Sequence, residues 1–263
     1  MHKQTEKMIV SEADVTSRCR CINKPGLYMI FPRANRVEHY LPQVDGVQAQ
    51  VLATPEHGAK FVEHELLVQP GGCTMKPRQE EFEQFLFVLE GGLQFELEGK
   101  AHKLVQGSFC WLPPQARWGF TNPGDELTRL LWIRRRYEAV KGIPIPGAIV
   151  AHESDVPAAP TDTYMEQHLT PYESLGFDMG INLQVFDPGA YFSMVEAHVM
   201  EHGLYMYYGR GIYWLNHDFI EVQKDDFIYM APYCPQFFYA TGWEKSAYVL
   251  YKDVNRDYVQ FLG

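Results

Sequence analysis

Glutamate and histidine side chains that could bind a metal lie close together in one short segment of this 263-residue chain, EAHVMEH, which ends at His202. Glu196 and His198 are two positions apart, so on a β-strand both would face the same side. Gln236 ends the turn-like sequence PYCPQ and could add an amide oxygen from the next hairpin. Two imidazoles, a carboxylate and an amide, without a thiolate, suit Mn, Fe, Ni or Zn. The predicted metal ligands are therefore Glu196, His198, His202 and Gln236.

A lysine and two tyrosines could complete such a site. Tyr248 and Lys252 are four positions apart, so on one strand they would point the same way, and Tyr213 follows the histidine segment. A lysine near a divalent metal favours an anionic substrate, and tyrosine hydroxyls can orient polar groups. An ion that keeps two open positions could bind water or a small chelating ligand. These residues alone leave hydrolysis, isomerisation and oxygen chemistry open.

The elements that must position these residues are predicted to be short β-strands. The segment 85-FLFVLEGGLQFELEG-99 alternates apolar and polar residues around a Gly-Gly turn, which is typical of a β-hairpin. Further segments read in the same way, and long helical periodicity is scarce. Many short strands with frequent turns indicate a β-sandwich or barrel.

The chain also contains an internal repeat. At a shift of 118 residues, turn-forming residues coincide without an insertion, for example Gly91 with Gly209 and Pro114 with Pro232. The proline-rich segment 138–164 is the natural connector. We therefore expect two copies of one β-domain, at residues 1–145 and 146–263.

The first copy has different residues at the four ligand positions. Subtracting 118 from each position leads to Arg78, Glu80, Gln84 and Trp118. Arginine does not deprotonate to bind a metal, and tryptophan offers no lone pair. The N-terminal domain is therefore predicted to have lost its metal ligands and to have a structural or interfacial role.

Composition limits the class of partner. The formal net charge of −10 argues against nucleic acid and anionic membranes, which both need a basic face. A small-molecule substrate is therefore expected. Five cysteines without a framework pattern predict free thiols, and no apolar run approaches the length of a membrane span. With no signal peptide visible, these features predict a cytoplasmic protein.

The pattern E-x-H-x(3)-H-x(6)-G, followed by a proline-marked turn, resembles the double motif of the cupins. This resemblance implies an all-β tandem cupin (bicupin) of two double-stranded β-helix or jelly-roll barrels, with the metal inside one barrel. The chain departs from the usual pattern at three positions. His202 replaces the closing glutamate, Gln236 replaces the last histidine, and Asp225 replaces a glycine.

Nearly the whole chain resembles the (S)-ureidoglycine aminohydrolase family, through 176-GFDMGINLQVFDPGA-190, 196-EAHVMEHGLYMYYGRGIYWL-215, the PYCPQ turn and YKDVNRD. The resemblance implies Mn²⁺ on the four predicted ligands and hydrolysis of (S)-ureidoglycine to (S)-ureidoglycolate and ammonia. It also implies a homo-oligomer. Glu196 could accept or return a proton beside the bound amine. The implied catalytic residues are Glu196, Lys252 and Tyr248, and the implied substrate-binding residues are Tyr213, Tyr248, Lys252 and Gln236.

Two other functions are compatible with the same residues. Two histidines and one carboxylate can hold Fe(II) and leave positions for dioxygen, as in a metal-dependent oxygenase. A non-catalytic bicupin that binds a small carboxylate is the second alternative. Oxygen consumption would identify the first, and saturable binding without turnover would identify the second.

Overall fold

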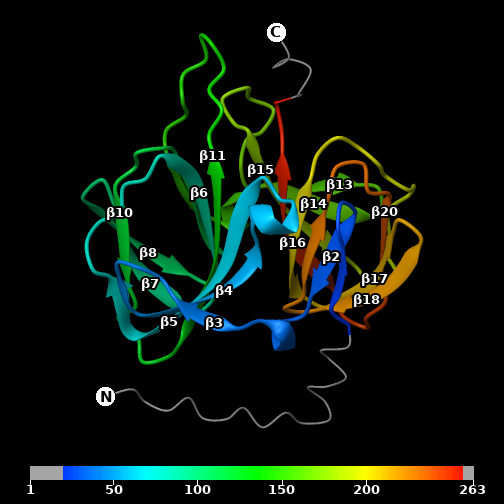
Figure 1. Cartoon of the computed structure of the whole chain (residues 1–263), viewed down its shortest axis with the longest axis horizontal. Coiled ribbons are helices and arrows are strands. Elements are labelled where there is room, and N and C mark those ends of the chain that lie inside the picture. The colour runs from blue at the N-terminus through cyan, green and yellow to red at the C-terminus, as the bar shows by residue number, and fades with distance from the viewer. Residues whose placement is uncertain (1–19, 257–263) are drawn as a thin grey trace.

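The computed structural model describes residues 20–256, and this part of the chain is almost entirely β-structure (Figure 1). The strands curl into two barrels that lie side by side. No helix in this range is long and apolar enough to cross a membrane. The prediction of an all-β fold is confirmed. The three helices of this range are single 3-10 turns: η1 (Arg33–Asn35), η2 (Pro55–His57) and η3 (Glu153–Asp155).

The first barrel is a curled ten-stranded sheet, in which β12-β9-β6-β11-β5-β10-β7-β8 are neighbours and β4 joins β3 to β5. The predicted Gly-Gly turn connects β6 to β7, and Gly91 adopts φ +80° there, a conformation that favours glycine. The strands are β3 (Glu38–Tyr40), β4 (Val44–Ala53), β5 (Phe61–Thr74), β6 (Phe82–Glu90), β7 (Gly92–Leu97), β8 (Lys100–Val105), β9 (Ser108–Leu112), β10 (Trp118–Thr121), β11 (Thr128–Arg136) and β12 (Ile149–His152).

The second barrel combines an eight-stranded sheet, ordered β1-β2-β19-β16-β21-β15-β14-β13, with a three-stranded sheet, ordered β18-β17-β20. An apolar cluster that includes Phe186, Leu204 and Leu250 fills the space between them. The strands are β1 (Ile22–Lys24), β2 (Tyr28–Phe31), β13 (Ala159–Thr161), β14 (Tyr164–His168), β15 (Met179–Phe186), β16 (His202–Tyr208), β17 (Arg210–Leu215), β18 (Asp218–Gln223), β19 (Phe227–Met230), β20 (Gln236–Ala240) and β21 (Ser246–Asp253).

The two barrels exchange strands. β2, from the start of the chain, pairs antiparallel with β19 of the second barrel. In the opposite direction, β12 lies within the predicted connector and pairs with β9 of the first barrel. One strand from before the predicted boundary at residues 145/146 thus pairs in the second barrel, and one strand from after it pairs in the first.

The internal repeat is confirmed by strand register. Gln84 pairs with Arg134 between β6 and β11, and His202 pairs with Lys252 between β16 and β21. Both residues of the second pair lie 118 positions after those of the first. The isolated bridges Arg78–Trp118 and Glu196–Gln236 are related by the same shift. The barrels are thus two copies of one pattern, and corresponding positions can be compared directly.

The interface between the barrels is mostly apolar. A single buried cluster contains Phe85 and Trp111 from the first barrel with Tyr205 and Tyr251 from the second. Buried charges lie beside it, because Arg129 Nε donates to Glu65 Oε1 at 2.7 Å and Tyr205 donates to the same carboxylate. This shared core fixes the first barrel against the outer face of the sheet that carries the predicted site.

The described cysteines, at positions 21, 73, 110 and 234, form no disulfide, as predicted for them. Cys19 lies outside the described residues.

Candidate metal centre

The four predicted metal ligands come from three segments at one end of the second barrel. His202 is the first residue of β16, and Gln236 is the first residue of β20. Glu196 and His198 lie in the irregular connection between β15 and β16, so the prediction that they share a regular strand is wrong. A single bridge replaces the strand. The backbone of Glu196 exchanges two hydrogen bonds with that of Gln236, at 2.9 and 3.0 Å. This bridge fixes the connection against the first residue of β20.

Three of the four side chains meet closely. His198 Nε2 lies 3.2 Å from His202 Nε2 and 3.2 Å from the amide nitrogen of Gln236. Two nitrogens about 2.1 Å from one metal and at right angles lie about 3 Å apart, so the imidazole spacing fits shared coordination. The Gln236 amide can present either its oxygen or its nitrogen at this point. Glu196 is the outlying member, with Oε2 3.9 Å from His198 Nε2.

The electrostatics favour the protonation states that bind metals. Burial lowers the pKa of His202 well below its ordinary value, and the charges of His198 and Lys252 lower it further. Burial likewise lowers the pKa of His198. Both rings therefore remain neutral near pH 7, which is the form that ligates a metal. Their buried Nδ1 atoms have no hydrogen-bond partner within the described residues.

Within residues 20–256, no three His, Cys, Asp or Glu side chains form a group that could hold a metal ion by themselves. The predicted set contains only three residues of these types, and one of them, Glu196, stands apart. The set is complete only with the Gln236 amide and an inward position of the carboxylate. The donors that are present, two neutral imidazoles, an amide and a carboxylate, fit a borderline divalent cation.

Lys252, Tyr248 and Tyr213 lie in the same barrel as these residues. Tyr248 and Lys252 are both on β21, as the prediction of a shared strand required. The Lys252 ammonium lies 4.4 Å from the Tyr172 ring centre, and burial lowers its pKa. Tyr213 and Tyr248 are fully buried, and the Tyr213 hydroxyl donates to that of Tyr248 at 3.4 Å. Lys252 therefore lies beside the predicted ligands, whereas the two tyrosines form the polar floor of the barrel.

Sequence reasoning missed several polar residues of this barrel. Glu166 and Gln184 face each other across β14 and β15, and the Gln184 amide donates to the Glu166 carboxylate at 2.9 Å. The Tyr248 hydroxyl in turn donates to Gln184 Oε1. Asn182 is fully buried one row away. The signal that could have revealed them is polar residues at alternate positions of strands whose neighbouring positions are apolar.

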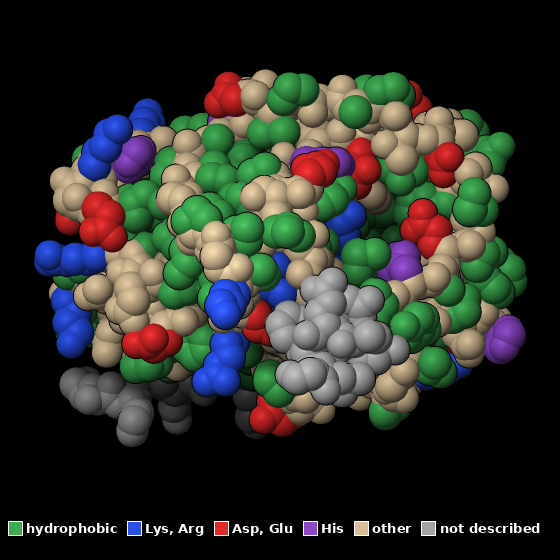
Figure 2. Space-filling view, turned by 90° about the horizontal axis from the view of Figure 1, so that it is seen from above, with side chains coloured by type: hydrophobic (Ala, Val, Ile, Leu, Met, Phe, Trp, Pro, Cys, Tyr) green, Lys and Arg blue, Asp and Glu red, His purple; other side chains and the backbone are tan. Residues whose placement is uncertain are grey.

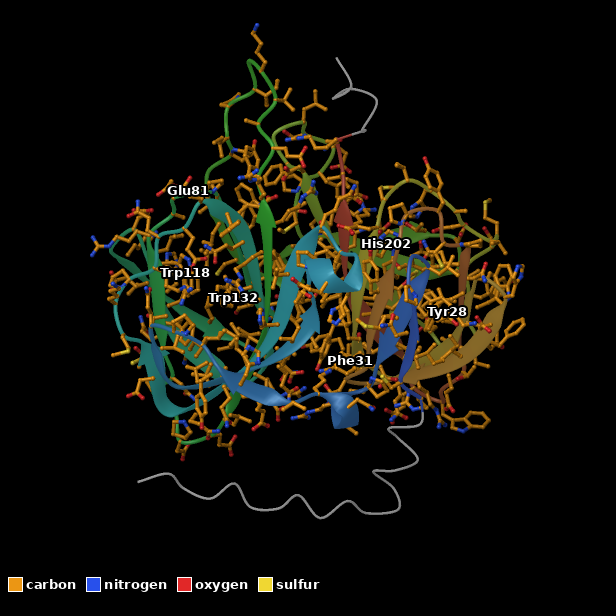
Figure 3. All side chains as sticks on the ribbon, in the orientation of Figure 1. Tyr28, Phe31, Glu81, Trp118, Trp132 and His202 are labelled. Carbon is orange, nitrogen blue, oxygen red and sulfur yellow. The ribbon has the colours of Figure 1, made fainter. Side chains whose placement is uncertain are left out.

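None of the four positions of the first barrel that correspond to the predicted ligands is a histidine: they are Arg78, Glu80, Gln84 and Trp118. The Arg78 guanidinium pairs with the Glu80 carboxylate and lies 4.9 Å from the Trp132 ring centre. The Trp118 ring packs edge-on against Trp132 at 5.9 Å. Figure 3 shows both tryptophans inside the first barrel and His202 in the second. An arginine and two aromatic rings thus occupy the space that corresponds to the candidate metal centre.

A surface pocket of about 420 Å³ opens beside the candidate centre. Lys252, Tyr172 and Met200 line it together with Lys60 from the first barrel. Over the second barrel, the face shown in Figure 2 has histidine and acidic side chains beside a hollow. This pocket gives a small molecule a route to Lys252.

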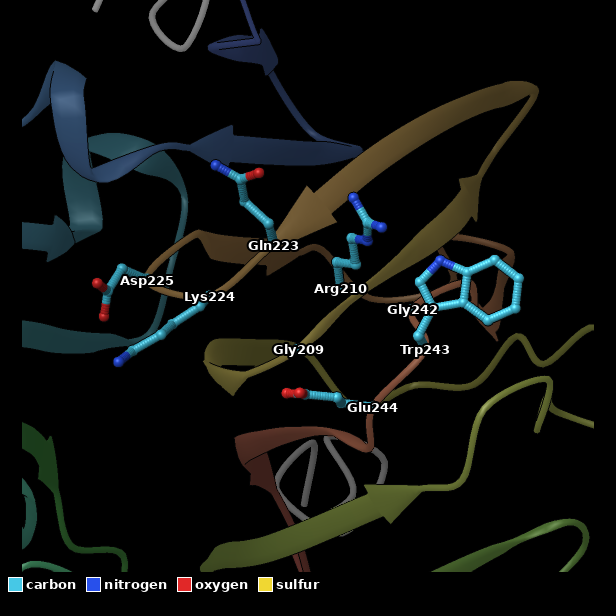
Figure 4. A pocket seen from close by; sticks show the side chains of 8 residues that line it. All are labelled: Gly209, Arg210, Gln223, Lys224, Asp225, Gly242, Trp243 and Glu244. Atoms are coloured by element: carbon cyan, nitrogen blue, oxygen red, sulfur yellow. The ribbon is translucent and has the colours of Figure 1, made fainter. Parts of the chain in front are cut away.

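A larger pocket, of about 470 Å³, lies elsewhere. It surrounds Gly209 and is lined by Arg210, Trp243 and Glu244 (Figure 4). Gly209 follows the end of β16 opposite His202, so this pocket is about 20 Å from the centre along the strand. None of the predicted site residues lines it, and size alone therefore does not identify the chemical site.

Comparison with known proteins agrees with this architecture. The family model of the cupin domain matches residues 64–134. The crystal structure of protein Ylba from E. coli superposes with a TM-score of 0.84 at 30% identity, covering 94% of this chain and 98% of that one. A putative glyoxylate induced protein from Pseudomonas aeruginosa superposes with a TM-score of 0.83 at 34% identity, covering 90% and 92%. The predicted tandem cupin fold is confirmed.

One curated relative identifies the family. The (S)-ureidoglycine aminohydrolase of Escherichia coli (strain K12) is 33% identical over 242 residues, which are 90% of this chain and 92% of that protein. Similarity at this level covers both barrels. The chain therefore belongs to the (S)-ureidoglycine aminohydrolase family.

Proposed function

We propose that this protein hydrolyses (S)-ureidoglycine to (S)-ureidoglycolate and ammonia. In this reaction water supplies a hydroxyl to Cα, the bond from Cα to the amino nitrogen breaks, and the amine leaves with the proton from water. The observation that supports this function most strongly is the meeting of His198, His202 and Gln236 within 3.2 Å contacts, in a family named for this activity.

The proposed cofactor is Mn²⁺, and Fe, Ni or Zn suit the same donors. His198, His202, Gln236 and Glu196 would hold it. When bound, such an ion acidifies coordinated water and stabilises negative charge. The pairing of imidazole nitrogens with carboxylate and amide groups, without a thiolate, supports this choice of metals.

The protein's own residues would bind and orient the substrate. Lys252 is directly opposite His202 across β16 and β21, and its ammonium would neutralise the substrate carboxylate. The buried hydroxyls of Tyr213 and Tyr248 would form the polar floor beneath the substrate. Glu196, half-buried at the rim, would take or return the proton of the amine. This last role is a hypothesis that a Glu196→Gln variant tests: full turnover with normal metal binding would exclude it.

The proposed setting is a cytoplasmic homo-oligomer that acts on a small molecule and binds neither nucleic acid nor membrane. The net charge of −10 supports the exclusion of nucleic acid and anionic membrane. Light scattering on the purified protein tests the oligomeric state.

The experiment that tests the function measures ammonia release from freshly generated (S)-ureidoglycine by Mn-loaded protein, against the spontaneous background. Stereospecific formation of ureidoglycolate that disappears in a His198→Ala variant supports the proposal. A rate equal to background with Mn bound rejects it. Oxygen uptake measured on the same samples would instead identify the oxygenase alternative.

A further inference from the structure

A row of polar side chains crosses the inner face of the second barrel, away from the predicted ligands. Direct cross-strand pairing places Glu166 opposite Gln184, and Gln184 opposite Tyr248. Side chains of directly paired residues lie on the same face of a sheet. Tyr248 belongs to the inner apolar cluster, so all three side chains face the barrel interior. One row closer to Lys252, His168 pairs with Asn182.

Hydrogen bonds fix the orientation of this row. The Tyr248 hydroxyl donates to Gln184 Oε1, which leaves the Gln184 amide nitrogen to donate to Glu166 Oε1 at 2.9 Å. The Asn182 amide nitrogen donates to the same oxygen of Glu166. Glu166 Oε1 therefore receives two donors from the protein, and the carboxylate is held in one position.

Two hydrogen-bond acceptors have no donor here in the part of the chain that the structure describes: the second oxygen of the Glu166 carboxylate and the side-chain oxygen of Asn182. Glu166 Oε2 lies 3.6 Å from His168 Nε2, which is too far for a hydrogen bond. Asn182 Oδ1 is fully buried and has no partner within the described residues. A buried acceptor without a donor is costly, and most such groups are satisfied. The pair is therefore suited to a ligand that brings N–H groups.

The charged groups next to Glu166 and Asn182 indicate which kind of ligand would bind there. Glu166 is the carboxylate that most favours the charged form of Lys252, and it also acts on Glu196, so the three charged groups lie close enough to influence one another. A ligand whose carboxylate meets Lys252 would extend its other end toward Glu166. A ureido group carries several N–H donors, which the two open acceptors, Glu166 Oε2 and Asn182 Oδ1, could share.

We propose that Glu166 and Asn182 form a subsite for the ureido group of the substrate, in which Glu166 Oε2 and Asn182 Oδ1 accept its N–H groups and Glu166 determines specificity. This inference rests on the proposed function, because it assigns a ureido substrate to the same site. Gln184 and Tyr248 act as positioning residues that hold the Glu166 carboxylate.

The test compares two stable ligands. N-carbamoylglycine has the ureido group and carboxylate of the substrate but lacks the amine, and N-acetylglycine replaces its terminal NH₂ with a methyl group. Calorimetry on the Mn-loaded protein measures the affinity of both. We expect wild type to bind N-carbamoylglycine about tenfold more tightly or better, as for a hydrogen bond to a charged acceptor.

The Glu166→Gln variant should lose this preference. The donors of Gln184 and Asn182 would attract the new amide oxygen, so the new NH₂ group would face the ligand's N–H groups. The ratio of the two affinities should fall to about one, and KM for ureidoglycine should rise by more than kcat falls. Glu173→Gln is the matched control, because Glu173 also contacts His168 but its side chain is 69% exposed. The control should keep the preference.

Each outcome separates the two proposals. If the wild-type protein shows no turnover but prefers N-carbamoylglycine over N-acetylglycine, and this preference is lost in Glu166→Gln, the proposed reaction is rejected and the subsite is retained. If the wild-type protein turns over ureidoglycine and the Glu166→Gln variant keeps the preference for N-carbamoylglycine, the subsite is overturned and the proposed reaction is retained. If Glu166→Gln does not fold, Glu166→Asp keeps the charge and withdraws the carboxylate, and a preference equal to wild type would likewise overturn the inference.

Discussion

His202 and Lys252 are directly paired across β16 and β21, so their side chains project side by side into the second barrel. This places a cation next to a residue that can bind a metal only when neutral. Lys252 is one of the charges that lower the pKa of His202. A single cross-strand pair thus connects the proposed substrate-binding lysine with a proposed metal ligand.

Replacing His202 by alanine should remove the metal. The loss of a buried imidazole leaves His198, Gln236 and the more distant Glu196, and we expect affinity for Mn²⁺ to fall by more than about 100-fold. Elemental analysis after dialysis against a chelator measures this. Glu80→Gln is the matched control, since Glu80 corresponds by the repeat to His198. Loss of Mn²⁺ from the control would place the metal in the first barrel instead.

Replacing Lys252 by methionine should weaken substrate binding while metal content stays normal. Removing a charged hydrogen-bond donor for the carboxylate is expected to lower kcat/KM about 10- to 100-fold. Lys245→Met is the control, because Lys245 is exposed and pairs with Asp187 3.1 Å away. Equal kinetics in both variants would argue against a role of Lys252 in binding the substrate.

Replacing Arg129 by methionine should destabilise the whole protein. Arg129 Nε donates to Glu65 in the first barrel and its Nη2 donates to Asp225 in the second, at 2.7 and 2.8 Å. Breaking a buried ion pair on one side costs about 3–5 kcal/mol of unfolding free energy. Urea unfolding measures the change, with exposed Arg117→Met as control. A shift no larger than that of the control would mean that the Arg129 ion pairs do not help to join the barrels.

The stability of the protein should depend on pH through Glu63. Burial raises the pKa of Glu63 to about 8 in the folded protein, from an ordinary value of 4.5. Between these values the folded state retains a proton that the unfolded state loses, so this residue lowers stability as the pH rises from about 4.5 to 8. Below 4.5 both states hold the proton, and above 8 neither does.

A Glu63→Gln variant tests this linkage, because the amide is neutral at every pH. Its stability relative to wild type should rise across the same pH range and reach a plateau on the order of 5 kcal/mol above pH 8. Urea unfolding at several pH values measures the difference. A difference that stays constant with pH would show that the carboxyl does not titrate in this range.

Much of the site could be predicted because the repeat supplied a frame. The 118-residue shift is preserved in the pairs Gln84–Arg134 and His202–Lys252, since glycines and prolines mark the same turns in both copies. Each of the four predicted ligands in the second barrel could therefore be compared with the residue at the corresponding position of the first. The spacing of Tyr248 and Lys252 fitted a strand that the structure contains.

Other features depend on contacts that local patterns do not encode. Glu166 and Gln184 lie on different strands, and their sequence separation does not reveal that they face each other. Glu196 and His198 have strand-like spacing, but one backbone bridge to Gln236 holds them instead of a sheet. The pairing of β2 with the second barrel is decided by which edge is free in three dimensions, and the repeat alone assigns β2 to the first.

The exchange of β2 constrains the order in which the protein can be made. Tyr28 pairs with Met230, a partner that the ribosome adds about 200 residues later. At about 5–20 residues per second, the strand YMIF waits on the order of 10 to 40 s for β19. During synthesis the first barrel can close before the second exists, and β2 can pair with the neighbouring β1, but the edge of β2 that faces β19 must wait until nearly the whole chain has emerged. The last strand pairs of the second barrel therefore form only after translation is almost complete.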